Sequence, residues 1–440
     1  MIDSEPQILV ALASRMTRAF PALKGVFRLP DGRPVSGELC ASSNGQAVVL
    51  ADAAGKPVAE GLEILLTPDD PRSSYFTVAD VAIGIDFHWQ RTESQSFRGD
   101  ALLRADKDGT ISVLNRIGLE AYLASVISSE MSAQAPPEFL KAQAVAARSW
   151  LCAMLEKKKT PRKASSCSEG EILRWQDVND HEGFDVCADD HCQRYQGITK
   201  IISDNVARAV GATHGAFLVH QDTICDARYY KCCGGRTDVF ATAWEDADFP
   251  YLASIADSDI PHPPMTSEDG WAAWLGSSPE AYCNTKDTDL LARVLPAFDL
   301  ETLHFYRWRV AYDKEELEEI LRRKSGIDFG ELQHLKPLSR GPSGRIFKLQ
   351  IVGTKRTVTV GKELEIRRWL SPTHLLSSAF VAATEHDPKG RLTRFILHGG
   401  GWGHGVGLCQ IGAAVMAEKG FSSDKILAHY FPGAELRKLY

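Results

Sequence analysis

Long hydrophobic runs are absent from this 440-residue sequence. No stretch approaches the roughly 20 apolar residues that a transmembrane helix needs, so the sequence predicts no membrane span. Residues 1–16 also lack a basic start, an apolar core and a small-residue cleavage site, and they therefore predict no signal peptide. An excess of positive charge is missing as well. The 50 Lys and Arg residues against 57 Asp and Glu give a net charge of −7, which argues against nucleic acid or an anionic membrane surface as a partner.

Internal repeats, low-complexity segments and a disulfide framework are also lacking. Ten cysteines are too few for a disulfide scaffold in a chain of this length. Hydrophobic residues make up 44% of the chain and charged residues 24%, which are ordinary proportions for a globular protein. Such a chain can bury one large core or two to three smaller ones.

The first quarter of the chain predicts β structure. Short strand patterns occupy residues 75–80, 82–89 and 97–104, and the Asp-Gly pair at 108–109 is a hairpin-turn signal. No residue in this part suggests chemistry. We therefore predict a β-rich N-terminal module over residues 1–110.

The rest of the chain, residues 111–440, mixes helical and strand patterns. We predict a mixed α/β core here, with a first half at 111–260, a middle segment at 261–390 and a closing segment at 391–440. The closing segment holds a glycine-rich run and C-terminal helices. With its β-rich module, the whole chain is expected to be an α+β protein.

One predicted helix carries two cations and follows an isolated carboxyl. The helix is expected to begin at Pro137, because the missing N–H of proline is harmless in the first helical turn. Lys141 and Arg148 are two turns apart, so they share one side of this helix. The carboxyl is Glu130. Taken alone, these residues favour a solvated helix face and a surface carboxylate.

A glycine-rich run lies between a predicted strand and a predicted helix near the C-terminus. It spans residues 398–410 and includes Trp402, His404 and Gln410. It lacks the Gly-Lys-Ser/Thr of a phosphate loop, and its spacing departs from the dinucleotide fingerprint. We expect the glycines to let the backbone approach a ligand closely, with Trp402 and His404 lining the opening.

Two separated motifs resemble the family of stage II sporulation protein D (SpoIID) and the amidase enhancer LytB. The first contains Ser-Glu-Met at 129–131 and the run Leu-Lys-Ala-Gln-Ala-Val-Ala-Ala-Arg-Ser at 140–149. The second is Gly-Trp-Gly-His-Gly-Val-Gly at 401–407, after which Leu408 and Cys409 replace the usual Met and Ser. The resemblance covers roughly residues 110–440 and implies a SpoIID-like catalytic core.

Two histidines and two cysteines fall within twelve residues: His181, Cys187, His191 and Cys192. Thiolates and imidazoles suit tetrahedral zinc, but a Cys187–Cys192 disulfide or free thiols fit the spacing as well. The family resemblance implies zinc, because some members hold it with a His, Cys, His, Cys set in this order. With four protein ligands, the zinc would be structural.

The resemblance also implies lytic cleavage of peptidoglycan at the β-1,4 bond between N-acetylmuramic acid and N-acetylglucosamine. Glu130 matches the catalytic glutamate of the family. A hydrolytic glycosidase normally needs two carboxylates. A lytic transglycosylase needs only one, which protonates the leaving oxygen and then deprotonates the muramyl 6-hydroxyl as it closes a 1,6-anhydro ring. This carboxyl must be protonated near neutral pH, which requires a desolvated pocket, and catalysis requires no cofactor.

The same resemblance assigns five further residues to substrate binding: Lys141, Arg148, Trp402, His404 and Gln410. A peptidoglycan substrate implies export to the periplasm or cell envelope. Two other functions stay open at this point. One is a non-catalytic glycan-binding module that activates a cell-wall amidase, as the amidase-enhancer members suggest. The other is a cysteine hydrolase using Cys409 and His404, for which the sequence identifies no orienting acid.

Overall fold

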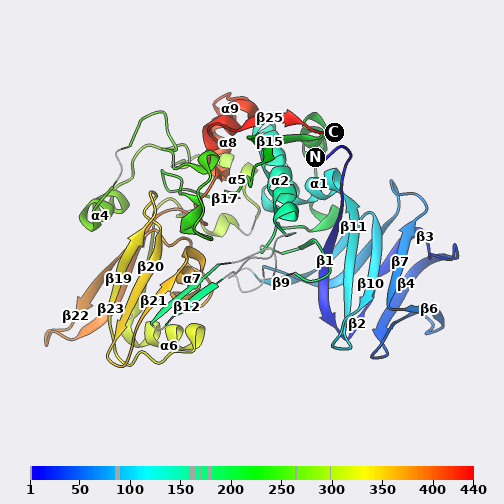
Figure 1. Ribbon diagram of the computed structural model, residues 1–440, viewed down its shortest axis with the longest axis horizontal. Coiled ribbons are helices and arrows are strands. Elements are labelled where there is room, and N and C mark those ends of the chain that lie inside the picture. Colours follow the sequence, from blue (N-terminus) through cyan, green and yellow to red (C-terminus); the bar gives the residue numbers. More distant parts are fainter. Residues whose placement is uncertain are drawn as a thin grey trace. The chain divides into compact units, whose positions relative to one another are not determined.

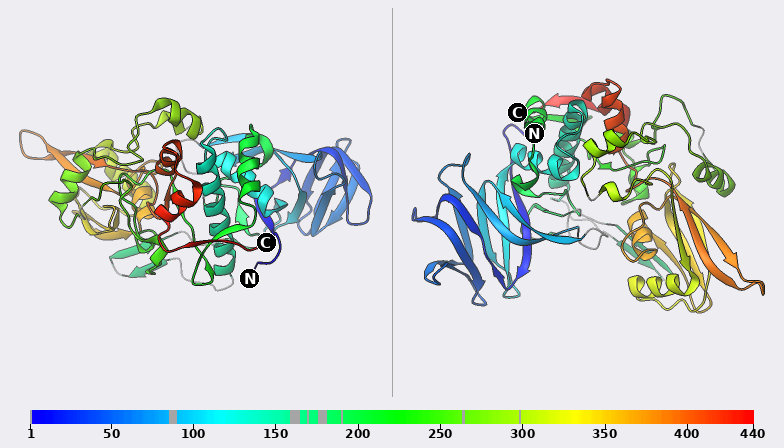
Figure 2. Two further views of the ribbon diagram at one scale, coloured as in Figure 1. Left: turned by 90° about the horizontal axis from the view of Figure 1, so that it is seen from above. Right: turned by 180° about the vertical axis from the view of Figure 1, so that it is seen from behind.

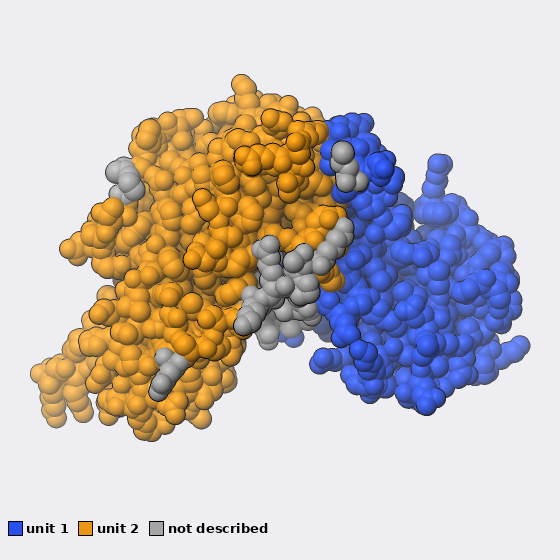
Figure 3. Space-filling model, viewed as in Figure 1, with its two compact units in different colours: residues 1–134, 178–216, 438–440 blue, residues 135–177, 217–437 orange. Residues whose placement is uncertain are grey.

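The chain forms two compact units (Figure 3). Unit 1 comprises residues 1–134, 178–216 and 438–440, and unit 2 comprises residues 135–177 and 217–437. Helices and strands are both abundant, which confirms the α+β class (Figure 1). The predicted divisions at residues 110, 260 and 390 stay predictions. The computed structural model describes residues 2–84, 90–158, 165–168, 170–175, 181–189, 191–262, 265–297 and 299–440.

Unit 1 is dominated by one large sheet, which confirms the predicted β-rich N-terminal region. Its strands are β1 (Gln7–Met16), β2 (Arg18–Ala19), β3 (Ala22–Arg28), β4 (Pro34–Ser43), β5 (Val48–Asp52), β6 (Pro57–Gly61), β7 (Glu63–Pro68), β8 (Tyr75–Ile83), β9 (Arg91–Phe97), β10 (Asp100–Ala105), β11 (Ile111–Gly118) and β14 (Val186–Cys187). The main path runs β14-β1-β11-β10-β7-β3-β4-β5-β6, while β2 pairs with β4, and β8 pairs with β3 and β9. The short strand β14 is parallel to β1, so a segment far along the sequence extends the N-terminal sheet.

Two predicted strand boundaries in unit 1 are wrong, and local backbone conformation explains both. The pattern at 75–80 and residues 82–83 of the next pattern belong to one strand, β8, which bends at Asp80, a residue with a φ of 54°. Residues 85–89 lie outside the described residues. The pattern at 97–104 is divided into β9 and β10 by Gly99, whose φ of 83° is costly for any other residue.

The helices of unit 1 follow the sheet and are α1 (Leu119–Glu130), the 3-10 helix η2 (Gly197–Lys200) and α3 (Asp204–Ala212). Both η2 and α3 pack on α1. The two ends of the chain lie near each other at the start of α1 (Figure 2). There, Glu5 Oε1 accepts a hydrogen bond from the Glu120 N–H, and the Tyr440 hydroxyl donates to Glu120 Oε1 at 2.6 Å. These contacts hold the helix that ends with Glu130.

Unit 2 contains the predicted helix at Pro137, and that prediction is confirmed by α2 (Pro137–Lys157). Its other helices are η3 (Phe240–Thr242), η4 (Pro250–Leu252), α4 (Glu268–Gly276), α5 (Thr288–Val294), η5 (Asp299–Glu301), α6 (Lys314–Ser325), α7 (Glu363–Trp369), α8 (Gln410–Glu418) and α9 (Ser423–Tyr430). In the part of the chain that the structure describes, no helix combines the length and apolar character needed to cross a membrane.

The strands of unit 2 form several small sheets. They are β12 (Ser165–Ser168), β13 (Glu171–Arg174), β15 (Ala216–His220), β16 (Thr223–Ile224), β17 (Tyr229–Tyr230), β18 (Trp308–Asp313), β19 (Leu332–Arg340), β20 (Ile346–Gly353), β21 (Thr357–Gly361), β22 (Phe380–His386), β23 (Leu392–Gly399), β24 (Leu408–Cys409) and β25 (Glu435–Lys438). One sheet has the order β12-β13-β21-β20-β19, and another has the order β18-β23-β22. Helices α6 and α7 pack on these two sheets and share one apolar core with them.

A second part of unit 2 is built around α2. This helix is buried along most of its length and packs against α8 and α9. The parallel pair β17 and β24 leads into α8, because Cys409 at the end of β24 directly precedes the helix. The glycine-rich run therefore connects the strand β23 to the helices that cover α2.

Candidate functional site

Glu130 is the last residue of α1 and lies in a nearly dry position. Its neighbours Ile127 and Met131 are fully buried, and Glu130 itself is 9% exposed. The backbone N–H of Arg194 donates to Glu130 Oε1 at 3.0 Å. The guanidinium of Arg194 reaches the carbonyl of Ser129 at 3.5 Å. One carboxyl oxygen is thus held by a main-chain donor in a setting that excludes most water.

The segment that supplies Arg194 is fixed to α1 by aromatic residues. Tyr195 stacks on Tyr122 of α1, with the ring centroids 5.0 Å apart. The Tyr195 hydroxyl donates to Asn115 Oδ1 at 2.5 Å, and the Tyr122 hydroxyl donates to Gln193 Oε1 at 3.1 Å. Tyr122 is fully buried, so it serves this packing. The position of the Arg194 N–H is therefore determined by contacts on both sides of it.

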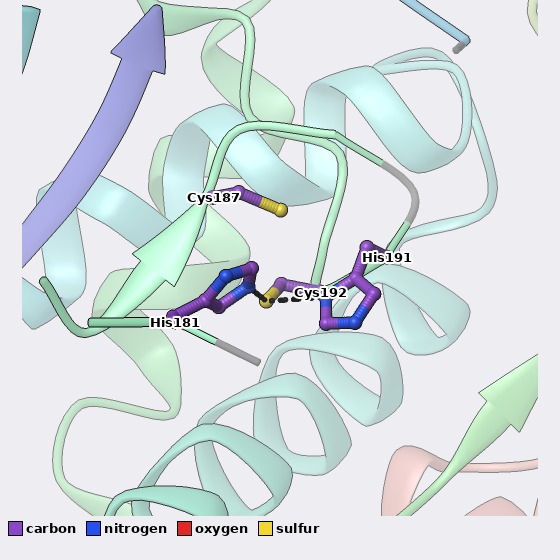
Figure 4. A group of neighbouring side chains, drawn as sticks. All are labelled: His181, Cys187, His191 and Cys192. Atoms are coloured by element: carbon purple, nitrogen blue, oxygen red, sulfur yellow. Dashed lines mark hydrogen bonds between the residues drawn. The ribbon is translucent and has the colours of Figure 1, made fainter. Parts of the chain in front are cut away.

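The four predicted metal ligands converge just before this segment (Figure 4). Their ligand atoms, from His181, Cys187, His191 and Cys192, all lie within 4.8 Å of one another. His181 Nε2 is 3.1 Å from Cys192 Sγ, and His191 Nδ1 is 3.5 Å from the same sulfur. Two sulfurs and two imidazole nitrogens at such separations fit one tetrahedral zinc ion.

The direction of the pKa shift of Cys187 agrees with this donor set. A hydrogen bond from Cys192 lowers the pKa of the Cys187 thiol, and His181 and His191 add to the effect against the opposing effect of burial. Thiolate is the form of cysteine that binds metal. The residues at this site therefore fit zinc, with all four positions of the ion filled by protein.

Lys141, one of the two predicted cations on α2, pairs with a carboxylate of the same helix. Lys141 Nζ is 2.6 Å from Glu138 Oε1, and the other oxygen of Glu138 accepts a hydrogen bond from the N–H of Ser423 at the start of α9. This contact links α2 to α9 through a carboxylate at a helix N-terminus, where a negative charge is favoured. Arg148, further along α2, is fully buried.

The glycine-rich run packs closely against side chains from other segments of unit 2. A side chain at Gly405 would meet the guanidinium of Arg345 at 2.6 Å, and one at Gly403 would meet Tyr230 at 2.9 Å. Both glycines also have positive φ angles. We expected these glycines to admit a ligand, but at these two positions they admit the side chains of Arg345 and Tyr230.

His404 has hydrogen-bond partners on both ring nitrogens. Its Nδ1 accepts from the Val406 N–H at 3.1 Å, so the proton resides on Nε2, which donates to the Tyr229 carbonyl at 3.0 Å. Desolvation, with the charges of Arg228 and Arg345, lowers the pKa of His404 well below its usual value. The neutral ring thus ties the glycine-rich run to β17.

Trp402 and Gln410 lie at the two ends of the same loop. Trp402 is partly exposed, and its backbone pairs with Cys232 through two hydrogen bonds. Gln410 is buried at the start of α8, and its Nε2 has no hydrogen-bond partner among the described residues.

Glu130 and the four metal-site residues belong to unit 1, whereas all five predicted substrate residues belong to unit 2.

The lowered pKa of His404 predicts acid sensitivity. Below about pH 6.5, histidine in the unfolded chain takes up a proton that folded His404 resists, so the free energy of unfolding falls as the pH falls. One such group contributes at most about 1.4 kcal/mol per pH unit. Thermal unfolding of the wild type and of His404→Gln between pH 5 and 7 should show a weaker pH dependence in the variant.

The matched control for this prediction is His429, whose pKa is also lowered by burial. His429→Gln should remove a separate part of the pH dependence, and the double variant should remove both parts. Equal pH dependence in the wild type and in His404→Gln would contradict the assignment of a neutral, partly buried ring to His404.

Sequence reasoning missed Arg194, which contacts Glu130 through its main chain. A backbone donor leaves no trace in residue type, so only the position of Arg194 two residues after Cys192 could have suggested it. It also missed Arg345, whose buried guanidinium supports the glycine-rich run.

Comparisons with known proteins match two regions of the chain to family models. Residues 107–220 match the family model described as Stage II sporulation protein, SpoIID. Residues 238–407 match a domain of unknown function, DUF8618.

Two curated relatives are named Stage II sporulation protein D, from Bacillus amyloliquefaciens and from Bacillus subtilis (strain 168). Each is 23% identical to this chain over 325 residues, which are 73% of this chain and 75% of the relative. A third relative is the Amidase enhancer of Bacillus subtilis (strain 168). It is 27% identical over 326 residues, which are 71% of this chain but only 40% of that protein.

Proposed function

Since this chain contains a SpoIID domain and is similar to stage II sporulation protein D over most of its length, we propose that it acts on the cell wall. The specific activity that we propose is that of a peptidoglycan lytic transglycosylase. The observation that carries this proposal is the buried carboxyl of Glu130, with one oxygen held by the Arg194 N–H. A single carboxyl in such a position suits a reaction in which one group serves first as acid and then as base.

In the proposed reaction, protonated Glu130 gives its proton to the oxygen that links N-acetylmuramic acid to N-acetylglucosamine. The bond from that oxygen to the anomeric carbon breaks, and the N-acetylglucosamine end leaves as an alcohol. The resulting carboxylate then takes the proton of the muramyl 6-hydroxyl, whose oxygen bonds to the anomeric carbon. Because nucleophile and electrophile belong to one sugar, no second carboxylate is needed to activate water.

The proposed zinc ion has a structural task. His181, Cys187, His191 and Cys192 would hold it, and it would supply a rigid crosslink within one short segment. Cys192 lies two residues before Arg194, so a stable metal site would hold the donor of the Glu130 hydrogen bond in place. The ion takes no part in the chemical steps.

We assign the substrate-binding residues of unit 2 different tasks according to their burial. Trp402 is partly exposed, so its ring can stack on a sugar. Gln410 is buried at the start of α8, so it supports this end of the loop and does not reach a sugar. His404 holds the loop that carries them, while Lys141 and Arg148 support α2.

A second function is favoured by the similarity to an amidase enhancer. In that case the chain would bind glycan without cutting it and would activate a cell-wall amidase. Both functions place the substrate outside the cytoplasm, and we propose that the protein is exported to the cell envelope.

The two functions differ in their products. Purified glycan strands, with and without stem peptides, should be incubated with the protein and the products identified by mass spectrometry. Products ending in 1,6-anhydro-N-acetylmuramic acid would support the transglycosylase. Products with ordinary reducing ends would contradict the transglycosylase and indicate a hydrolase. Absence of cleavage, together with faster peptide release when an amidase is added, would contradict the transglycosylase and indicate an amidase enhancer.

A further inference from the structure

Unit 2 contains a second group of metal-type ligands that the proposed function does not use. Its members are Cys233, Asp257, Cys283 and Cys409, and they come from four segments that lie far apart in the sequence. All four are at most 2% exposed. Their ligand atoms all lie within 4.8 Å of one another. Tertiary packing therefore brings three sulfurs and a carboxylate together in one buried position.

The separations suit tetrahedral coordination. Cys233 Sγ is 3.2 Å from Asp257 Oδ2 and 3.3 Å from Cys283 Sγ. Thiolates bound at about 2.3 Å to one tetrahedral zinc ion lie roughly 3.8 Å from each other. The Cys233–Cys283 sulfur separation of 3.3 Å is below this value and the 4.8 Å limit for the group is above it, so small side-chain shifts would place all four donors around an ion.

The buried carboxylate lacks a cationic side chain as a partner. Asp257 Oδ1 accepts from the Tyr430 hydroxyl at 2.5 Å, and Oδ2 accepts from the Cys283 N–H at 3.0 Å and from the Cys233 thiol. Among the described residues, no Lys or Arg pairs with Asp257. Buried charges are normally paired or coordinate a metal, and here a divalent cation would compensate the carboxylate and its neighbouring thiolates.

Main-chain donors point at the sulfurs. The Gly235 N–H donates to Cys233 Sγ, and the Cys233 N–H donates to Cys409 Sγ, each at 3.3 Å. The buried guanidinium of Arg345 binds the carbonyls of Cys232 and Cys233 at 3.3 Å and 3.2 Å. Outer contacts of this kind orient the ligands of a metal site and stabilise negatively charged sulfur.

We propose that Cys233, Asp257, Cys283 and Cys409 form a second structural zinc site. Three thiolates favour a soft divalent ion, and four protein ligands leave no position for water or substrate. The ion would join the start of α8 to the turn after β17 and to two further segments. This proposal does not depend on the activity proposed above.

Burial and hydrogen bonding also argue against a cysteine hydrolase that uses Cys409 and His404. Cys409 is fully buried, and both ring nitrogens of His404 are occupied by Tyr229 and Val406. A cysteine hydrolase needs an accessible sulfur with a histidine free to take its proton. The alternative that remains for experiment is a disulfide between Cys233 and Cys283.

The test is metal analysis of the full chain, purified without chelators. The wild type should contain about two zinc ions per chain, and Cys187→Ser should retain about one. Combining Cys187→Ser with Cys283→Ser or with Asp257→Asn should remove the remaining ion. Cys225 provides the matched control because it is buried in unit 2 but lies outside the ligand group, so Cys225→Ser should keep both ions.

Two further measurements keep the test informative if a variant does not fold. Cobalt replacing zinc in Cys187→Ser should give thiolate-to-metal charge-transfer bands, which report sulfur ligation in a folded chain. The non-reduced chain should have the mass of ten free thiols. A mass about 2 Da lower, with Cys233 linked to Cys283, would overturn the proposal. Retention of the metal in Cys187→Ser combined with Asp257→Asn would overturn the assignment of Asp257 as the fourth ligand.

Discussion

Replacing Glu130 with glutamine is expected to lower the rate of anhydromuramyl product formation by about 10²- to 10⁴-fold, the usual contribution of general acid–base catalysis. Glutamine has the shape of a protonated glutamic acid, but it can neither give a proton to the glycosidic oxygen nor take one from the 6-hydroxyl. The rate should be measured by mass spectrometry of products from purified glycan strands. Binding of the strands, measured separately, should change little.

The geometry makes this variant a fair test of chemistry. The carbonyl oxygen of glutamine can still accept the hydrogen bond from the Arg194 N–H, so the end of α1 should stay intact. A melting temperature equal to that of the wild type would confirm this. The control Glu63→Gln makes the same chemical change at an exposed position of unit 1 and should cleave normally. A Glu130→Gln variant that cleaves at the wild-type rate would exclude Glu130 as the acid and base.

Loss of the proposed zinc ion from the site at 181–192 is expected to have the next largest effect. Cys192→Ser should release about one zinc ion and lower the cleavage rate by about 10- to 100-fold, as changes near metal ligands commonly do. The expected cause is loss of order in the segment that places the Arg194 N–H on Glu130. Amide hydrogen exchange at residues 191–196 should therefore become faster in the variant.

Metal replacement separates a structural zinc from a catalytic one. A Cd²⁺-loaded protein should cleave at close to the wild-type rate, because the ion only has to hold four ligands. Cys40→Ser is the matched control, since Cys40 belongs to unit 1 but lies outside the metal group. A Cys192→Ser variant that keeps both its zinc and its exchange protection would contradict the proposed site.

Several features of this protein could be predicted from local sequence. Helix α2 begins at the predicted Pro137, because proline constrains its own backbone angle whatever surrounds it. The four ligands at 181–192 meet because a short loop keeps neighbours in sequence close in space. The motifs around Glu130 and the glycine-rich run predicted the SpoIID resemblance, which the comparisons confirm.

Other features are decided by tertiary structure alone. The donor that holds Glu130 is the backbone N–H of Arg194, a group that every residue except proline carries. The conformation of Gly99 divides what the pattern predicted as one strand, since strand propensity does not record a positive φ. Cys233, Asp257, Cys283 and Cys409 come together only because distant segments of unit 2 pack on one another. Local sequence determines short-range geometry, whereas contacts between distant segments depend on how the whole unit buries its apolar surface.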